Sequence, residues 1–481
     1  MTTVLVEGET CWRVRQADRA SVIIDAADFF RYARDAMMRA QKSIFMIGWD
    51  FDTRIDLVPG EDEDEAPEKL GKFLNWLADQ RSELDIRILK WDIGLINSIT
   101  RGETPFYILS WMFSKQVRLK LDGAHPPMSA HHMKLLVIDD RVAFCGGIDM
   151  TIGRWDTRDH LAHDKRRRSP MGFAQGPWHD ATTCVSGPAA AMLGELARVR
   201  WEHATHEKLE PVEAASDPWP RELEVEFRDI EIGIARTLPE YEDQRQVCEI
   251  EAMKLAMIRN AKKWLYIESQ YFASRTIAEA IAERLREPDG PEVVIINPEG
   301  ADGWLEAKAM DTARIRLMKL AREADVHDRF RLLYPVNDAR KPIYVHAKIM
   351  IMDDRVLKLG SANLNNRSMG YDTECDIIIE AKPDDDATAA QIMAERNDLL
   401  AEHLGCKPAD IAAEMEKHGS LIRAIDSLNR QDRRGLVAVP IRELTADEEL
   451  LAESDLADPE RPSGVRNRMT GYMRGKRYRH A

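Results

Sequence analysis

Short apolar runs alternate with amphipathic stretches along most of this chain, and the order repeats once. Residues 36–52 have the pattern of a helix that runs into a buried strand, and residues 255–272 have the same pattern. The other paired strand-like segments are 84–91 with 291–298 and 117–121 with 330–336, and helical stretches separate them at 67–81, 276–286 and 304–323. This alternation predicts an α/β fold with mixed sheets (α+β in character), in which each half is an α-β-α layer structure and the halves are related by a pseudo-twofold axis.

Within this repeat, the polar pattern His-x-Lys-x(4)-Asp occurs twice, 214 residues apart. Its members are His132, Lys134 and Asp139 in the first copy, and His346, Lys348 and Asp353 in the second. Polar and apolar positions alternate around each copy, which favours an extended segment whose histidine and lysine project to one face. The Asp-Asp-Arg that ends each copy predicts a turn before another extended run.

Each copy is followed, 14 residues after its histidine, by a turn of small residues that ends in a polar side chain. The first turn is Gly146-Gly147-Ile148-Asp149 and the second is Gly360-Ser361-Ala362-Asn363. A single His-x-Lys on an apolar strand is more often a packing or surface feature. Two copies with identical spacing instead indicate a duplicated functional unit, with the active site between the halves.

Two histidines and two lysines that face each other suit the cleavage of a phosphodiester. The ammonium groups can hold the non-bridging oxygens and stabilise the charge of the transition state. One imidazole can attack phosphorus to form a phosphohistidine, and the other can act as general acid and then general base. The lysines supply the positive charge, so we expect no metal and no cofactor in this chemistry.

These residues, with the blocks around them, resemble the phospholipase D superfamily. The chain is most similar to the phospholipases D of the eukaryotic type, and the resemblance runs from Ser43 to Glu380. The blocks that carry it are GGIDMTIGRWDTRDH at 146–160, GPWHDATTCVSGPAA at 176–190, YIESQYF at 266–272 and YVHAKIMIMDDRVLKLGSANLNNRSMGYDTE at 344–374. Ser269 stands where that family usually has asparagine.

The resemblance implies a role for each matching position. His132 and His346 would be the nucleophile and the general acid/base, with His132 favoured as nucleophile, and Lys134 and Lys348 would bind phosphate. Asp139 and Asp353 belong to the catalytic motif but would act structurally. The residues implied to line the phosphate site are Gly147, Asp149, Ser361 and Asn363.

A catalytic imidazole needs an acceptor to hold its second nitrogen. Aligning residues 178–187 with 372–381 places Asp180 opposite Glu374. We expect each carboxylate to orient one of the two histidines. The alternative is that both are ordinary strand-end carboxylates.

The implied activity is that of a phospholipase D. Such an enzyme hydrolyses the distal phosphodiester of glycerophospholipids to phosphatidic acid and the headgroup alcohol, with transphosphatidylation to other alcohols. A cardiolipin synthase-like phosphatidyltransferase is the nearest alternative, although such enzymes usually carry N-terminal membrane helices and the Gly153–Asp156 block favours the phospholipases. A phosphodiesterase or nuclease acting on nucleic acid is a second class. A membrane-binding module without activity is disfavoured, because all four His and Lys positions are intact.

Composition narrows the partners and the compartment. The net charge of −15 weighs against nucleic acid as a partner. Six cysteines without a Cys-x-x-Cys pair argue against a zinc site or a disulfide framework, and favour a reduced cytoplasm. The first ten residues lack the features of a secretory signal, which leaves export without a cleaved signal open. Only residues 1–42 precede the first block, so we expect no accessory lipid-binding domain and an activity that survives EDTA.

A phospholipid substrate implies peripheral contact with a membrane surface. Basic clusters at 165–168 and 466–479 could steer the protein to anionic lipid, and the apolar segment 106–113 could face it. For the domains, we predict an N-terminal unit over 1–213, a C-terminal unit over 214–405 and a helical and extended tail over 406–481. The oligomeric state does not follow from the sequence.

Overall fold

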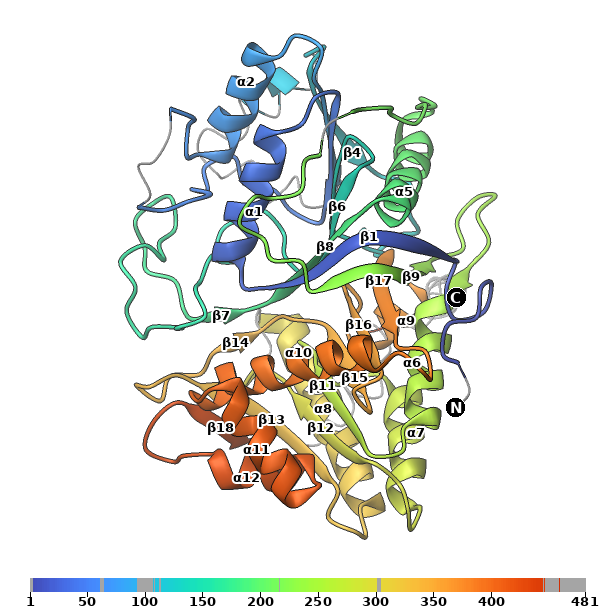
Figure 1. Ribbon diagram of the computed structural model, residues 1–481, viewed down its shortest axis with the longest axis vertical. Helices are drawn as coiled ribbons and strands as arrows, with labels where there is room; N and C mark the ends of the chain where they lie inside the picture. The colour runs from blue at the N-terminus through green and yellow to red at the C-terminus, as the bar shows by residue number, and fades with distance from the viewer. Residues whose placement is uncertain are drawn as a thin grey trace, which may run out of the picture.

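One mixed sheet extends through both halves of the molecule in the computed structural model (Figure 1). The structure describes residues 3–60, 65–92, 107, 109–111, 114–215, 217–300, 304–443, 445 and 458, without the side chains of 304–309. The sheet strands of the first half are β1 (Arg13–Ile24), β2 (Ser43–Gly48), β3 (Asp85–Trp91), β4 (Val117–Asp122), β5 (Leu135–Ile138), β6 (Val142–Gly146) and β8 (Ala181–Ser186). Those of the second half are β9 (Phe227–Leu238), β11 (Trp264–Glu268), β12 (Glu292–Ile296), β13 (Phe330–Val336), β15 (Ile349–Met352), β16 (Val356–Gly360), β17 (Glu374–Glu380) and β18 (Gly435–Ala438).

The order of the strands reveals the duplication. The sheet runs β18-β13-β12-β11-β15-β16-β17-β9-β1-β8-β6-β5-β2-β3-β4, with the short β10 (Val247–Cys248) paired to β9. On either side of the central antiparallel pair β9 and β1, corresponding strands follow in the same sequence outward. Apart from the edge strand β18, which is antiparallel to β13, the two outer pairs in each half are parallel and the inner pairs are antiparallel. The mixed α/β sheet expected from the sequence is confirmed.

Helices cover both faces of this sheet. The helices of the first half are α1 (Ala26–Met38), α2 (Leu70–Gln80) and α5 (Pro188–Thr205). Those of the second half are α6 (Glu249–Asn260), α7 (Arg275–Arg286), α8 (Trp304–Ala324), α9 (Asn366–Gly370), α10 (Asp386–Leu404), α11 (Pro408–His418) and α12 (Leu421–Leu428). One apolar core continues through both halves beneath α5 and α10 to α12. Two separate cores lie on the opposite face, one under α1 and α2 and one under α6 to α8.

The alternation in β2 shows why the strands read as continuous apolar runs. Ile44 and Met46 pack into the core under α1 and α2. Phe45 and Ile47 point the other way, into the core that the halves share. A strand that is buried on both faces needs apolar residues at every position, because successive side chains point to opposite faces.

One expectation about boundaries needs correction, that of the motif strands. In the tail predicted from residue 406, α11 ends at His418 and is followed by Gly419, whose φ of 59° is left-handed. The strands of the two motifs begin one residue after each lysine, at Leu135 and Ile349, so the histidine and lysine lie on the approach to the strand. The predicted divisions at 213 and 405 stay predictions. In the structure, α11 packs against α10, and β18 pairs with β13 at the sheet edge.

None of the helices in the described part of the chain combines the length and the hydropathy that a membrane span requires. The basic cluster at 466–479 lies outside the described residues, as does half of the apolar segment 106–113. In that segment Trp111 is buried and donates to Asn75, whereas Leu109 is exposed. Cys145, Cys184 and Cys375 are buried and not disulfide-bonded.

Candidate active site

The two motif histidines lie on extended segments that run beside the opposite half. The backbone N–H of His132 donates to the carbonyl of Thr373 at 2.9 Å, and that of His346 donates to the carbonyl of His179 at 2.7 Å. Next to the second contact, β14 (Tyr344–Val345) pairs in parallel with β7 (Trp178–His179). Each half therefore holds the catalytic motif of the other through backbone hydrogen bonds, and the two contacts correspond under the internal symmetry.

The carboxylates predicted to orient the histidines do so across the halves. Nδ1 of His132 lies 3.0 Å from Oε2 of Glu374, and Nδ1 of His346 lies 2.6 Å from Oδ2 of Asp180. In both cases Nδ1 is engaged, which leaves Nε2 of each imidazole available for a ligand.

The carboxylate of Glu374 accepts hydrogen bonds from several neighbouring groups. The Ser361 hydroxyl donates to it at 2.5 Å and the Ser368 hydroxyl at 2.7 Å. Burial raises the pKa of Glu374, but the His132 imidazole and the Ser361 hydroxyl outweigh burial and hold the pKa below its usual range. The carboxylate is therefore ionised, as an acceptor for an imidazole N–H must be. Ser361 acts here through Glu374, and sequence reasoning missed Ser368.

Asp180 packs directly against the small-residue turn of its own half. A Cβ at Gly147 would lie 2.2 Å from Oδ1 of Asp180, so only glycine fits at that position. Burial raises the pKa of Asp180, although the charge of Lys348 and the N–H of Ala181 oppose the rise. Gly147 thus shapes the site by admitting the carboxylate.

The motif lysines are buried but differ in their partners. Nζ of Lys134 lies 3.1 Å from Oδ2 of Asp149 and donates to the carbonyl of His132 at 2.7 Å. Lys348 donates to the carbonyl of His346, and within the described residues no carboxylate forms an ion pair with it. Asn363 takes the place of Asp149 in the second half, and it is neutral. Within the described residues, one lysine is therefore in an ion pair with a carboxylate and the other is not.

The electrostatics place the two motifs in one site. Burial, and after it the charges of Lys348, Arg154 and Lys134, lower the pKa of His346 well below its usual range, and His132 adds to the effect. Burial also lowers the pKa of Lys348 to about 7, and Lys134 and Arg154 contribute to the lowering against the opposing charge of Asp180. Groups from both halves thus act on the same imidazole and the same ammonium.

The carboxylates of the motif aspartates bind backbone N–H groups of neighbouring strands. Asp139 and Asp353 each begin a turn in which two consecutive aspartates have φ between 52° and 55°, the left-handed region that aspartate tolerates. The Asp139 carboxylate accepts the N–H groups of residues 41–43, all at 2.7 Å, and that of Asp353 accepts those of residues 262–264 at 2.7 to 3.0 Å. Both side chains fasten the start of a neighbouring strand, and in the described structure neither contacts a histidine.

A cavity of about 440 Å³ is lined by Arg154, Trp178 and Tyr344, and His346 is not part of its lining. The Trp178 ring stacks on Tyr344 with centroids 4.5 Å apart, and lies 5.2 Å from the imidazole of His346. The guanidinium of Arg154 lies over the same Trp178 ring, 4.2 Å from its centroid. Sequence reasoning did not single out Arg154, Trp178 or Tyr344, although each lies within a block that it quoted.

Comparison with known proteins identifies the family of the chain. A family model described as "Phospholipase D" matches residues 36–279, just over half of the chain. The chain belongs to the phospholipase D superfamily. A second model of the superfamily, "Cardiolipin synthase, PLD-like domain", matches residues 255–399.

Individual members of the superfamily are distant in sequence. Phospholipase D A of Dictyostelium discoideum is 26% identical, over 82% of this chain and 36% of that protein. Phospholipase D delta of Arabidopsis thaliana is 24% identical, over 77% of this chain and 62% of that protein. The chain thus spans less than two thirds of the length of either relative. The crystal structure of phosphatidylserine synthase from Haemophilus influenzae Rd KW20 shares the fold, with a TM-score of 0.54 at 14% identity over 85% of this chain and 94% of that one.

Proposed function

We propose that this chain is a phospholipase D that cleaves the distal phosphodiester of glycerophospholipids. The observation that carries the proposal is the pair of motif histidines, each with Nδ1 held by a carboxylate of the opposite half. The buried Lys134 and Lys348 beside them supply positive charge for the non-bridging oxygens of the phosphate.

In the first step, Nε2 of His132 attacks phosphorus, and the bond from phosphorus to the headgroup oxygen breaks. Protonated His346 gives its proton to that oxygen, which leaves as the alcohol. In the second step, water attacks the phosphohistidine while His346 removes its proton. The P–N bond breaks, and phosphatidic acid leaves. An alcohol in place of water gives transphosphatidylation.

The two histidines can exchange these roles, and one observation favours the exchange. The low pKa of His346 in the free site makes it neutral, which suits a nucleophile better than a general acid. A bound phosphodiester anion raises that pKa again, which restores the assignment of His132 as nucleophile. Rapid quenching with a phosphorus-labelled lipid, followed by peptide mapping of the phosphohistidine, decides between them.

The loop between β6 and β7 is the proposed contact with the membrane surface. Met171 and Phe173 are 71% and 64% exposed, and Leu161 is exposed as well. Among the neighbouring basic residues of the cluster at 165–168, Arg167 is buried in an ion pair with Asp156, whereas the other three are exposed. Exposed apolar side chains flanked by basic ones suit insertion into an anionic interface. Ser169 of this loop also lines the cavity that Trp178 and Tyr344 line.

A cardiolipin synthase-like phosphatidyl transfer is the second candidate, favoured by the family model that matches residues 255–399. Mass spectrometry of the products from mixed-headgroup liposomes that contain ethanol separates the two. We expect phosphatidic acid and phosphatidylethanol. Cardiolipin from phosphatidylglycerol as the dominant product would favour the synthase, and cleavage of plasmid DNA without lipid turnover would favour a nuclease.

A further inference from the structure

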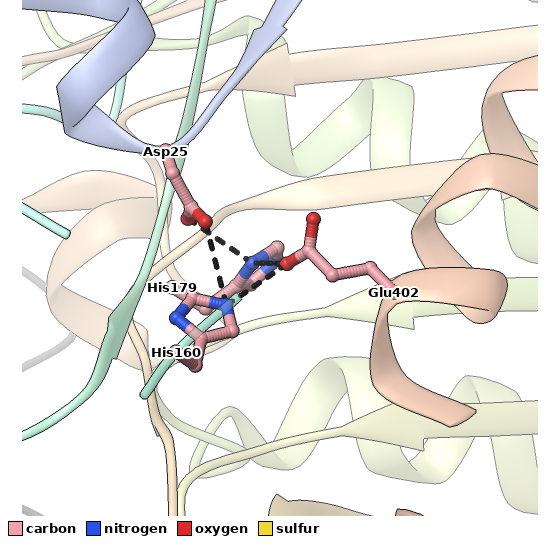
Figure 2. Close-up of side chains that lie close together, drawn as sticks. All are labelled: Asp25, His160, His179 and Glu402. Atoms are coloured by element: carbon pink, nitrogen blue, oxygen red, sulfur yellow. Dashed lines mark hydrogen bonds and ion pairs between the residues drawn. The ribbon is translucent and has the colours of Figure 1, made fainter. Parts of the chain in front are cut away.

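Four buried side chains converge next to the segments that carry Asp180 and His346 (Figure 2). Asp25 comes from the junction of β1 and α1, His160 from the loop after β6, His179 from β7 and Glu402 from α10 of the second half. The side chain of each is at most 2% exposed. None of the four takes part in the chemistry proposed above.

The donor atoms of this cluster are spaced like the ligands of a small metal ion. Nε2 of His160 lies 3.0 Å from Oε1 of Glu402 and 3.3 Å from Oδ2 of Asp25. Nδ1 of His179 lies 2.8 Å from the same Glu402 oxygen and 3.4 Å from Oδ1 of Asp25. A tetrahedral ion with bonds of about 2.0 Å holds its ligand atoms about 3.3 Å apart.

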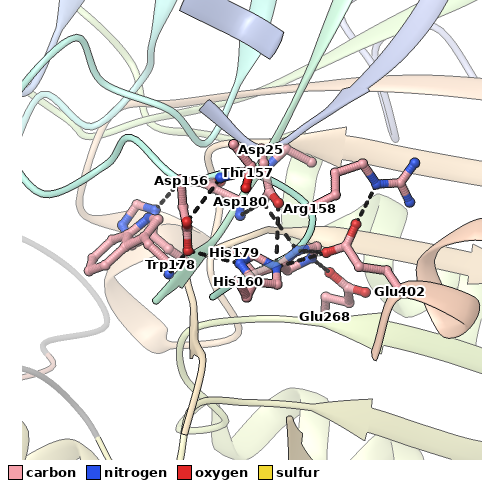
Figure 3. Close-up of polar contacts among 12 residues, drawn as sticks. Asp25, Asp156, Thr157, Arg158, His160, Trp178, His179, Asp180, Glu268 and Glu402 are labelled. Carbon is pink, nitrogen blue, oxygen red and sulfur yellow. Dashed lines mark hydrogen bonds and ion pairs between the residues drawn. The ribbon is translucent and has the colours of Figure 1, made fainter. Parts of the chain in front are cut away.

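The outer nitrogens of both imidazoles are held by carboxylates (Figure 3). Nδ1 of His160 lies 2.9 Å from Oδ2 of Asp156, and Nε2 of His179 lies 2.7 Å from Oε2 of Glu268. A carboxylate on the far nitrogen is the usual support of a metal-bound histidine, because it fixes the tautomer that directs the lone pair at the metal.

The inner nitrogens, Nε2 of His160 and Nδ1 of His179, face the carboxylates of Asp25 and Glu402. If the outer nitrogens carry the N–H groups, Nε2 of His160 and Nδ1 of His179 present lone pairs to the oxygens of Asp25 and Glu402. Among the described residues, Oδ2 of Asp25 is buried and accepts no hydrogen bond. Lone pairs and anionic oxygens crowded into one dry space require either a cation or protons between them.

We propose that Asp25, His160, His179 and Glu402 bind a zinc ion. Two imidazoles favour a transition-metal dication over magnesium or calcium, and four protein ligands without an open position are typical of a structural zinc site. Positive charge is also needed here. Arg158 pairs with Glu402 at 2.6 Å and with Asp398 at 2.8 Å, and Arg167 pairs with Asp156 at 2.6 Å, so the two arginines alone do not offset the carboxylates of Asp25, Glu402, Asp156 and Glu268.

The ion would stabilise the segments that position Asp180 and His346. Asp25 and Asp180 exchange backbone and side-chain hydrogen bonds of 2.8 and 3.1 Å, and the carbonyl of His179 accepts from the N–H of His346. Glu402 brings the second half to the same point. The role is structural, so it leaves the lysine-based chemistry of the phosphate site unchanged.

Metal analysis of the full chain, produced without an affinity tag and desalted, tests the proposal. We expect about one zinc ion per wild-type chain, and its loss in His160→Gln and Glu402→Gln. The matched control is His131→Gln, at a buried histidine that pairs with Asp122 at 3.0 Å outside the cluster, which keeps the zinc. X-ray absorption of the wild-type protein then shows two imidazoles and two oxygens at about 2.0 Å.

The X-ray absorption spectrum of the wild-type protein tests the zinc proposal even if the variants do not fold. Wild-type protein that holds no stoichiometric zinc after refolding with the metal would overturn the proposal, and would mean that protons occupy the inner nitrogens. Zinc that survives both substitutions, a sulfur ligand in the spectrum, or a different metal at full occupancy would overturn it equally.

Discussion

Glu374 of the second half holds Nδ1 of His132 of the first half at 3.0 Å. The complementary contact joins His346 to Asp180 at 2.6 Å. Neither half can therefore assemble a complete imidazole–carboxylate pair alone, and the reactive site depends on how the halves meet.

Removing the orienting carboxylate should affect the chemical step. For Glu374→Gln we expect kcat to fall by about 10³- to 10⁴-fold, since an amide cannot stabilise the imidazolium that forms. His132→Ala and His346→Asn should lower turnover by at least as much without unfolding the protein. Steady-state kinetics with vesicles and circular dichroism measure both quantities. A His132→Ala variant with near-normal turnover would rule out its assigned role.

The motif aspartates should behave differently. For Asp139→Asn we expect the free energy of unfolding to fall by about 1–3 kcal/mol, because the carboxylate that accepts three backbone N–H groups becomes a weaker acceptor. The kcat of the folded fraction should stay close to that of the wild type. Denaturant titration beside kinetics checks this, with Asp353→Asn as the symmetric partner. A drop in kcat as large as that of the histidine variants would mean a catalytic role.

The motif lysines should be needed for transition-state binding. Lys134→Ala should cost about 3–4 kcal/mol in kcat/KM, the usual effect of deleting a charged donor in a dry site. Lys348→Ala should be at least as severe, because within the described residues Lys348 forms no ion pair and is free to serve the phosphate. Kinetics on a water-soluble short-chain lipid isolate this effect from membrane binding. Equal affinity for the phosphate product in Lys348→Ala and wild type would contradict it.

The pKa of Lys348 predicts a pH limb. Burial lowers that pKa to about 7, so the ammonium form dominates below this pH and is lost above it. Because the charged form binds phosphate, kcat/KM should fall as pH rises through about 7. In Lys348→Arg the guanidinium stays charged, and the limb should disappear even if activity is reduced. A limb that persists in the arginine variant would assign it to another group.

The exposed loop should matter only at an interface. Phe173→Asp should lower the activity on anionic vesicles by about tenfold or more, because a charge replaces an inserting apolar side chain. Its activity on a short-chain lipid below the micellar concentration should match wild type. Val326→Asp, at another exposed apolar side chain (69% exposed), is the control for added charge. Equal losses on both substrates would remove the loop from membrane docking.

Much of this structure could be predicted from the sequence because the duplication is explicit in it. The two motifs, their turns and the apolar strands on either side keep matching spacing, so the mixed sheet and the candidate residues followed. The pairing of His132 with Glu374 did not follow in the same way. Alignment of the halves shows which positions correspond. Only the packing of the halves decides whether a carboxylate contacts the histidine of its own half or that of the opposite half.

The Asp25–His160–His179–Glu402 cluster was invisible for a related reason. Its residues are spread over four segments, with no short spacing that would mark a metal site. The pattern of cysteines also argues against a zinc site. The long central strands β1 and β9, which join the halves, also lacked a counterpart in the predicted elements. Segments that act by joining distant parts of a chain leave little local signal.

The central claim is that both motif imidazoles reach one phosphorus atom. A crystal structure with bound vanadate tests it most directly. The account predicts that Nε2 of His132 and Nε2 of His346 lie on opposite sides of the vanadium, with Lys134 and Lys348 on its equatorial oxygens. Vanadate bound to one histidine alone, or rings too far apart to share it, would contradict the account.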